Sequence, residues 1–202
     1  MVLLALFSAS SLSAGAAGSF QILVFSKTAA FRHASIADGI AAIRDLGALN
    51  NFDVVATEDA NVFTDAGLAP FKAVVFLSTT GDILDANQQA AFEGYIRGGG
   101  GFVGIHSATD TEYSWPWYGE LVRAYFANHP VIQNATVVVE DTNDVSTAQL
   151  PAAWIRNDEW YNFQTNPRAN VHVLCRLDES SYSGGTMGDH PIAWYQDRKS
   201  VV

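Results

Sequence analysis

A dense group of polar side chains follows a short apolar segment near the middle of the chain. Residues 98–101 are four consecutive glycines, residues 102–105 form an apolar run typical of a buried strand, and His106, Ser107 and Asp110 follow closely. In open parallel sheets, ligands bind beyond the carboxyl ends of the strands, so this position suits chemistry. His106 is suited to general acid or base catalysis because an imidazole titrates near neutral pH; Asp110 would orient it and Ser107 would bond a substrate hydroxyl. The structural alternative is a glycine-rich turn whose histidine caps a helix or bonds the backbone.

Three other segments carry residues of the same chemical kind. Glu159 suits acid–base chemistry, and its neighbours Trp160 and Tyr161 offer aromatic faces that cover the apolar faces of sugars. His33 follows the first predicted strand, and His190 precedes the last one. Each has a structural alternative: a cap before a helix for His33, and acids solvated over packed aromatic rings for Glu159.

Imidazole and carboxylate groups are also suitable ligands for Zn²⁺ or Mn²⁺. The candidates of this type show no local spacing such as His-x-x-x-His, so a metal site would depend wholly on convergence in space. They are His33, His106, Glu159 and His190. The sequence therefore predicts no metal and no other cofactor.

The positions of these side chains depend on the elements around them. Apolar segments at residues 21–25, 52–57, 73–77 and 102–105 alternate with helical patterns after Ser35 and at residues 85–97. This order predicts right-handed crossovers and a parallel sheet with helices on both faces. We therefore expect the polar residues after the first, third and fourth strands to converge at one edge: His33, Thr79, Thr80, Asp82, His106, Ser107 and Asp110.

The second half of the chain has a different pattern, with an aromatic loop followed by a predicted helix at residues 118–126. Strands are predicted at residues 135–140, 171–177 and 192–195. No repeat, linker or second domain is evident, and 202 residues suit one domain.

Composition limits the classes of partner. The net charge is −10 and no Lys/Arg cluster stands out, which argues against nucleic acid and against a membrane surface. A neutral small molecule such as a carbohydrate fits this charge better, and the oligomeric state is left open. The only cysteine, Cys175, lies in a strand-like segment, so no intrachain disulfide is possible and a core position is expected.

Residues 1–18 combine an apolar start with small-residue cleavage sites, which is typical of a signal peptide although the basic segment is missing. The segment is too short for a membrane span. We therefore expect a secreted protein; the alternative is a cytoplasmic protein with an apolar leader.

Four separated segments together resemble the trehalose-utilisation (ThuA-like) family: residues 25–33, 99–110, 158–162 and 189–194. The resemblance places the chain in the class I glutamine amidotransferase-like superfamily. It implies a flavodoxin-like three-layer sandwich with a mostly parallel sheet over residues 19–202. It also implies a link to carbohydrate metabolism, involving disaccharides or their 3-keto derivatives.

The chain departs from these patterns in two places. Glutamine amidotransferases carry a nucleophilic cysteine at the turn where this chain has His106, as the ThuA-like group does, so a glutaminase is excluded because no acyl-enzyme can form. Family members also continue with a further strand, a Gly-His-Thr loop and a closing helix. The resemblance therefore implies that the C-terminal strand and helix are missing from residues 19–202.

Two hypotheses of function follow. In the first, the protein is an enzyme that acts on a glycoside or 3-keto-sugar by proton transfer, with His106 as the central acid or base and Glu159 and His33 assisting. The substrate would then be bound by Ser107, Asp110, Trp160, Tyr161 and His190. In the second, the domain binds carbohydrate or acts as a scaffold without catalysis.

Overall fold

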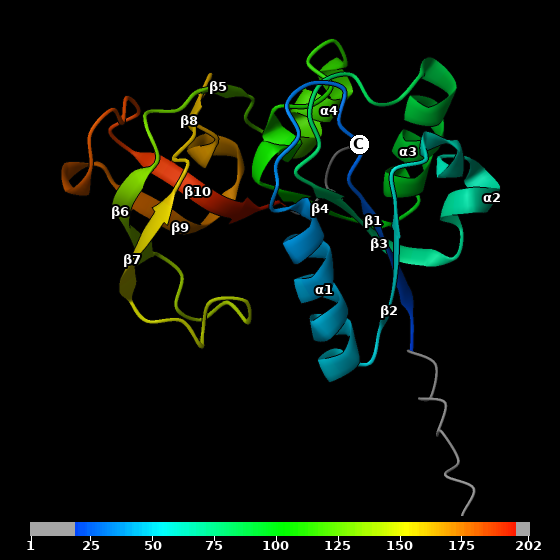
Figure 1. The fold of residues 1–202 in the computed structure, drawn as a ribbon, viewed down its shortest axis with the longest axis horizontal. Coiled ribbons are helices and arrows are strands. Elements are labelled where there is room, and N and C mark those ends of the chain that lie inside the picture. Colours follow the sequence, from blue (N-terminus) through cyan, green and yellow to red (C-terminus); the bar gives the residue numbers. More distant parts are fainter. Residues whose placement is uncertain (1–18, 197–202) are drawn as a thin grey trace, which may run out of the picture.

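The computed structural model describes residues 19–196, so the predicted signal peptide and the C-terminal end of the chain lie outside the described residues. The first half forms a parallel sheet in the order β2-β1-β3-β4 (Figure 1). Its strands are β1 (Gln21–Phe25), β2 (Asp53–Thr57), β3 (Phe71–Leu77) and β4 (Gly101–Ile105). The predicted parallel sheet is confirmed, with strand ends shifted by at most two residues.

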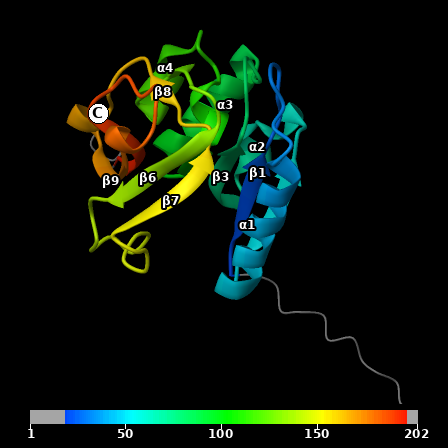
Figure 2. The ribbon, with the colours of Figure 1, turned by 60° about the vertical axis from the view of Figure 1, so that its left-hand side comes forward.

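Helices cover both faces of this sheet. On one face, α1 (Ile36–Asn50) packs Ile40 and Ile43 against Val24 and Leu77, and Figure 2 shows it lying along β1. The other face is covered by α2 (Asp65–Leu68), α3 (Ala86–Arg97) and α4 (Pro116–Val122). These three layers confirm the helices on both faces that the alternation of strands and helices predicts, and they form the flavodoxin-like arrangement that the family resemblance implies.

The ends of α3 follow from local chemistry. The Asp85 carboxylate accepts hydrogen bonds from the backbone N–H groups of Asn87 and Gln88, and the Gln88 side chain accepts one from the Asp85 backbone N–H. This reciprocal capping satisfies donors that the first turn leaves unpaired. The helix ends at Arg97, where the glycine run begins, as predicted.

Gly100 provides a stability test of this turn. A Cβ at Gly100 would lie 2.3 Å from the ring of Tyr95, whereas one at Gly94, within α3, would meet nothing within 4 Å. We expect Gly100→Ala to destabilise the fold by about 1–3 kcal/mol through overpacking. Gly94→Ala should stabilise it by up to about 1 kcal/mol, because alanine favours a helix over glycine. Urea unfolding of both variants measures the difference, and equal midpoints would contradict this account.

The strand β4 is less buried than its apolar sequence predicts. Within residues 19–196 it pairs only with β3, and its Val103 side chain is 47% exposed. By contrast, β3 pairs on both sides, and Val74 and Phe76 are fully buried. The prediction of a buried strand was wrong. An apolar sequence indicates that a strand can be buried, but how far it is buried depends on how many strands pair with it, and this cannot be read from the run itself.

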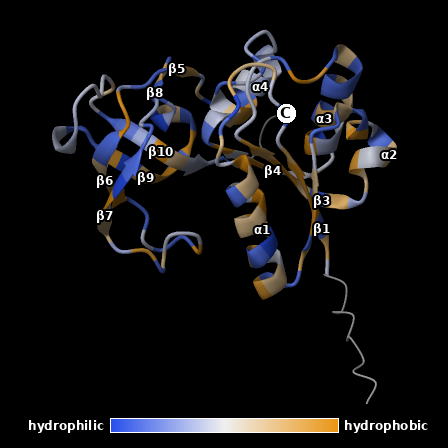
Figure 3. Cartoon of the chain, in the orientation of Figure 1, coloured by the Kyte–Doolittle hydropathy of each residue, from blue (hydrophilic) through white to orange (hydrophobic). Residues whose placement is uncertain are grey.

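The second half forms a separate antiparallel sheet in the order β10-β9-β6-β7, which the sequence did not predict (Figures 1 and 3). Its strands are β6 (Gln133–Val139), β7 (Ala153–Asp158), β9 (His172–Asp178) and β10 (His190–Tyr195). Val137, Leu177, Trp160 and Cys175 form a core of its own, and Cys175 is buried as predicted. A small ribbon pairs β5 (Phe126–Asn128) with β8 (Asn162–Phe163).

Short segments complete the chain. The predicted helix at residues 118–126 is displaced, because Pro116 begins α4 and Arg123 ends it in the left-handed conformation. Within residues 19–196 there are four 3₁₀ helices: η1 (Ala60–Val62), η2 (His106–Thr109), η3 (Arg168–Asn170) and η4 (Glu179–Ser181). In the part of the chain described here, no helix has the length and apolarity needed to cross a membrane.

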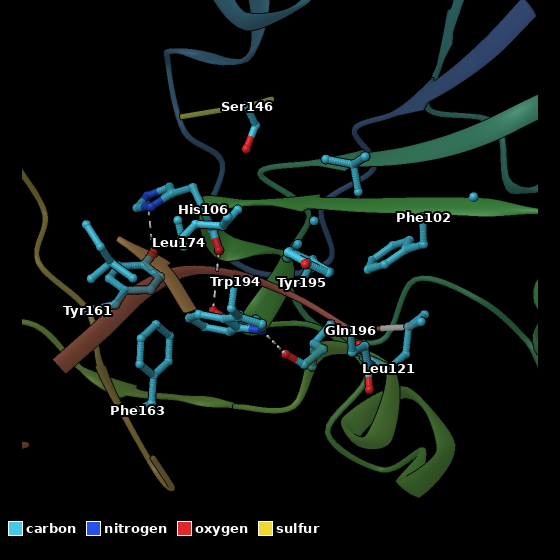
Figure 4. A pocket seen from close by; sticks show the side chains of 18 of the residues that line it. Phe102, His106, Leu121, Ser146, Tyr161, Phe163, Leu174, Trp194, Tyr195 and Gln196 are labelled. Carbon is cyan, nitrogen blue, oxygen red and sulfur yellow. Dashed lines mark hydrogen bonds between the residues drawn. The ribbon is translucent and has the colours of Figure 1, made fainter. Parts of the chain in front are cut away.

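The two halves of the chain meet where β10 ends beside α4. The Trp194 indole donates a hydrogen bond to the Val122 carbonyl at 3.1 Å, and the Gln196 amide donates one to the Leu121 carbonyl at 2.7 Å. A cavity of about 1180 Å³ lies between β4 and the second sheet (Figure 4). His106, Glu159 and Tyr161 are among the residues that line it.

Candidate functional site

Three ionisable side chains from distant parts of the sequence meet beside the cavity, and two of them line it. The Nε2 atoms of His33 and His106 are 3.0 Å apart. The Glu159 Oε2 atom lies 3.3 Å from His106 Nε2 and 3.5 Å from His33 Nε2. His33 comes from the loop after β1, His106 directly follows β4, and Glu159 directly follows β7. Both sheets therefore contribute to this cluster.

The predicted convergence of the loops after the parallel strands is confirmed. Isolated parallel bridges join Thr28 to Thr80 and Gly81 to Thr111, which extends the sheet order beyond the strand ends. The buried Thr79 and Thr111 hydroxyls are 2.9 Å apart, and the Thr111 hydroxyl donates to the Ser107 carbonyl at 3.1 Å. These contacts hold the loops after β3 and β4 together next to His106.

His106 has a left-handed backbone conformation, with φ of 55°. Such a conformation is uncommon for residues other than glycine, and it persists where the surrounding structure imposes it. It forms the sharp turn between β4 and η2 that presents the imidazole at the end of the strand. Next to it, Ser107 is fully buried, and its hydroxyl lies 3.4 Å from Nδ1 of His33.

The surroundings of His106 favour the neutral imidazole. Burial lowers the pKa of His106, and the adjacent His33 lowers it further, while Glu159 and Asp158 oppose the shift. The His106 side chain still keeps 24% exposure, against 10% for His33. Its hydrogen-bond partners are side chains, so the ring is accessible from the cavity and not sealed against the backbone.

Tyr161 covers the His106 ring. The ring centroids are 4.5 Å apart, and the tyrosine hydroxyl lies 3.3 Å from His106 Nε2 (Figure 4). Burial raises the pKa of Tyr161 and the negative charge of Glu159 raises it further, so the hydroxyl stays protonated. It can therefore donate a hydrogen bond or a proton at the cluster.

His190 lies behind this layer and not in the cluster. It is fully buried, its Nε2 donates to the Tyr161 carbonyl at 2.8 Å, and its Nδ1 lies 2.8 Å from the Glu179 carboxylate. The ring therefore positions the Tyr161 backbone. Direct substrate contact, which the sequence suggested for His190, would require this buried ring to be uncovered.

The other predicted binding residues take different positions. The Asp110 carboxylate accepts a hydrogen bond from the Tyr113 hydroxyl at 2.7 Å, and no bond to His106 is found within residues 19–196. Trp160 lines the cavity, but it is only 5% exposed and its indole donates to the Gln133 carbonyl at 2.8 Å. The polar groups of both side chains are therefore bonded to other parts of the protein and not to the cluster.

Sequence patterns missed two supporting acids. Glu112 is fully buried and accepts hydrogen bonds from the backbone N–H groups of Ile83 and Leu84, both at 2.8 Å. Glu179 accepts from the backbone N–H groups of Met187 and Gly188 and also faces His190. Neither belongs to a recognisable spacing, although Glu112 stands out as an acid between a polar turn and an aromatic loop.

The cavity beside the cluster has two kinds of wall. His106, Glu159 and Tyr161 line its polar end. Apolar side chains also line the cavity, among them Phe102, Leu121, Phe163, Leu174 and Trp194 (Figure 4). The combination offers hydrogen-bonding groups together with aromatic faces, which suits a sugar ring.

Comparison with known proteins places this fold and site. The family model described as "Trehalose utilisation" matches residues 21–201. The chain belongs to the ThuA family. This ThuA-family match spans all four sequence segments that carried the resemblance, including those with His33, His106, Glu159 and His190.

Two solved structures agree with the ThuA assignment. A ThuA-like protein from Bacteroides uniformis is 27% identical, with a TM-score of 0.75 over 89% of this chain and 78% of that one. A ThuA-like protein from Parabacteroides merdae is 18% identical, with a TM-score of 0.71 over 88% of this chain and 75% of that one, which shows a shared fold. A search of proteins with curated functions finds none that matches this chain.

Proposed function

We propose that this ThuA-family protein is an enzyme that binds a glycoside or a 3-keto-sugar in the cavity and transfers a proton at the substrate. The observation that carries the proposal is the cluster of His33, His106 and Glu159, whose polar atoms lie 3.0–3.5 Å apart, with His106 and Glu159 lining the cavity. His190 is fully buried and donates to a backbone carbonyl, whereas His106 is partly exposed, bonds side chains through its ring and lines the cavity.

A 3-keto-sugar suits this chemistry because the carbonyl acidifies the hydrogen on the adjacent carbon, C2. His106 would accept that proton, and the electron pair of the broken C–H bond would move into an enolate. When the enolate collapses, the glycosidic C1–oxygen bond breaks and the leaving oxygen takes a proton. The Tyr161 hydroxyl, which lies 3.3 Å from His106 Nε2, would donate that proton. Water adding across the resulting double bond completes hydrolysis.

The roles of the neighbours follow from their contacts. Glu159 lies within 3.5 Å of both imidazoles and would stabilise the positive charge that develops on them. His33 would hold the His106 ring in place, since its own ring is fixed by Ser107. The net charge of −10 favours an uncharged substrate over an anionic one.

Proton transfer can be tested without detecting a final product. The protein is incubated in D₂O with a 3-keto-disaccharide, and proton NMR follows the C2 hydrogen and released monosaccharide. We expect deuterium at C2 and cleavage of the glycosidic bond, both absent without protein. Binding of the sugar with neither exchange nor cleavage would contradict the proposal and support the non-catalytic carbohydrate-binding alternative.

A further inference from the structure

We infer that His33, His106 and Glu159 form a binding site for one divalent transition-metal ion, best matched to Zn²⁺. The inference concerns the side chains of the proposed function, but it depends on metal binding and not on the carbohydrate chemistry. Its evidence is the geometry of three ligand atoms, their fixed orientation and the open space beside them.

The spacing of the ligand atoms fits a tetrahedral ion. Tetrahedral Zn²⁺ with bonds of about 2.0 Å holds its ligand atoms about 3.3 Å apart. The three distances here are 3.0, 3.3 and 3.5 Å, which bracket that value. An ion about 0.6 Å outside the plane of the three atoms would lie about 2.0 Å from each of them. Two imidazoles and one carboxylate are donors that Zn²⁺ accepts.

A metal ion can bind the lone pairs of all three atoms in this cluster, whereas a shared proton cannot. Nε2 of His33, Nε2 of His106 and Oε2 of Glu159 converge on one point, and each presents a lone pair there when both rings are neutral and carry their proton on Nδ1. A single N–H can point to only one of its two neighbours at a time. A divalent ion at that point accepts all three lone pairs together.

The ring orientation of His33 is fixed from behind. Its Nδ1 faces the hydroxyl of the fully buried Ser107 at 3.4 Å, which directs Nε2 toward the centre of the cluster. Metal-binding histidines commonly have such a partner on the second ring nitrogen. The turn at His106, with φ of 55°, holds the other imidazole at the end of β4.

One coordination position would remain open. His106 and Glu159 keep 24% and 20% of their side chains exposed, and both line the cavity. Zn²⁺ sites that perform chemistry have three protein ligands and one position for water or substrate. That open position would admit a water molecule or a substrate oxygen.

The cluster differs from other pairs of acid and histidine in this protein. His172 pairs with Asp141 at 2.7 Å and His190 pairs with Glu179 at 2.8 Å. Among residues 19–196, only His33, His106 and Glu159 are identified as a group of three suitable ligands.

The test is calorimetric titration of the chelator-treated full chain with ZnCl₂, together with visible spectroscopy of the Co²⁺-loaded protein. We expect one ion per chain and the absorption bands of tetrahedral Co²⁺. Removing a side chain that only supports a metal ligand weakens metal binding about 10–100-fold. Glu159→Gln and His33→Ala each change a ligand itself, so we expect each to weaken Zn²⁺ binding by at least about 100-fold. His172→Ala, which removes an exposed histidine on β9, should leave the affinity unchanged.

The outcomes separate this inference from the proposed function. Absence of Zn²⁺ binding, or equal affinity in the wild type and Glu159→Gln, would overturn the metal site. Glu159→Gln preserves the size of the side chain, so an intact thermal transition would show that a loss of binding is not a loss of fold. Sugar turnover by protein that binds no Zn²⁺ would overturn the metal site alone, whereas Zn²⁺ binding without turnover would overturn only the proposed function.

Discussion

Replacement of His106 by asparagine is expected to lower the rate of C2 deuterium exchange and of sugar cleavage by about 10²- to 10⁴-fold. His106 is the only member of the cluster that contacts His33, Glu159 and Tyr161 together. Asparagine cannot accept and return a proton as imidazole does, so the proton-transfer step loses its acid or base. Initial rates measured by NMR at saturating sugar report the effect.

Asparagine is the suitable substitution because of the backbone at this position. Among residues other than glycine, asparagine tolerates the left-handed conformation that His106 adopts, with φ of 55°. The variant should therefore fold, which a thermal melt can check. His172→Asn is the matched control, because it removes a half-exposed histidine that pairs with Asp141 outside the site. Equal rates for His106→Asn and the wild type would show that the imidazole has no catalytic role.

The largest effect on stability is expected at Glu112. Its Oε1 accepts hydrogen bonds from the backbone N–H groups of Ile83 and Leu84, and its Oε2 accepts one from the Gln89 amide at 2.7 Å. Glu112→Ala leaves two backbone donors at buried residues without a partner, at about 1–3 kcal/mol for each group. We expect a loss of about 3 kcal/mol, which lowers the melting temperature by about 6–12 °C for a chain of this size.

Two further variants separate the hydrogen bonds from the charge. Glu112→Gln keeps an oxygen for the two backbone donors but places an amide N–H₂ against Gln89, so its loss should be smaller than that of Glu112→Ala. Glu93→Ala removes an acid from an exposed ion pair with Arg97 in α3, so it should change stability by less than about 1 kcal/mol. Similar melting temperatures for all three variants would contradict the role of Glu112.

Local sequence determined the strands and helices of the first sheet, which carry His33 and His106. Apolar runs indicated β1 and β3, the helical pattern at residues 85–97 predicted α3, and the glycines after Arg97 predicted its end. These signals are local, because hydropathy and capping depend on residues a few positions apart. Right-handed crossovers then fixed the shared edge on which the His33 and His106 loops meet.

Tertiary structure alone decided which other residues reach that edge. Glu159 arrives from the end of β7, a strand of a second sheet whose order no local pattern encodes. His190 looks chemically equal to His33 in sequence, yet the pairing of β10 with β9 buries it behind Tyr161. The exposure of β4 has the same origin. Burial depends on which strands pair and what packs over them, and these long-range contacts are not encoded in the spacing of neighbouring residues.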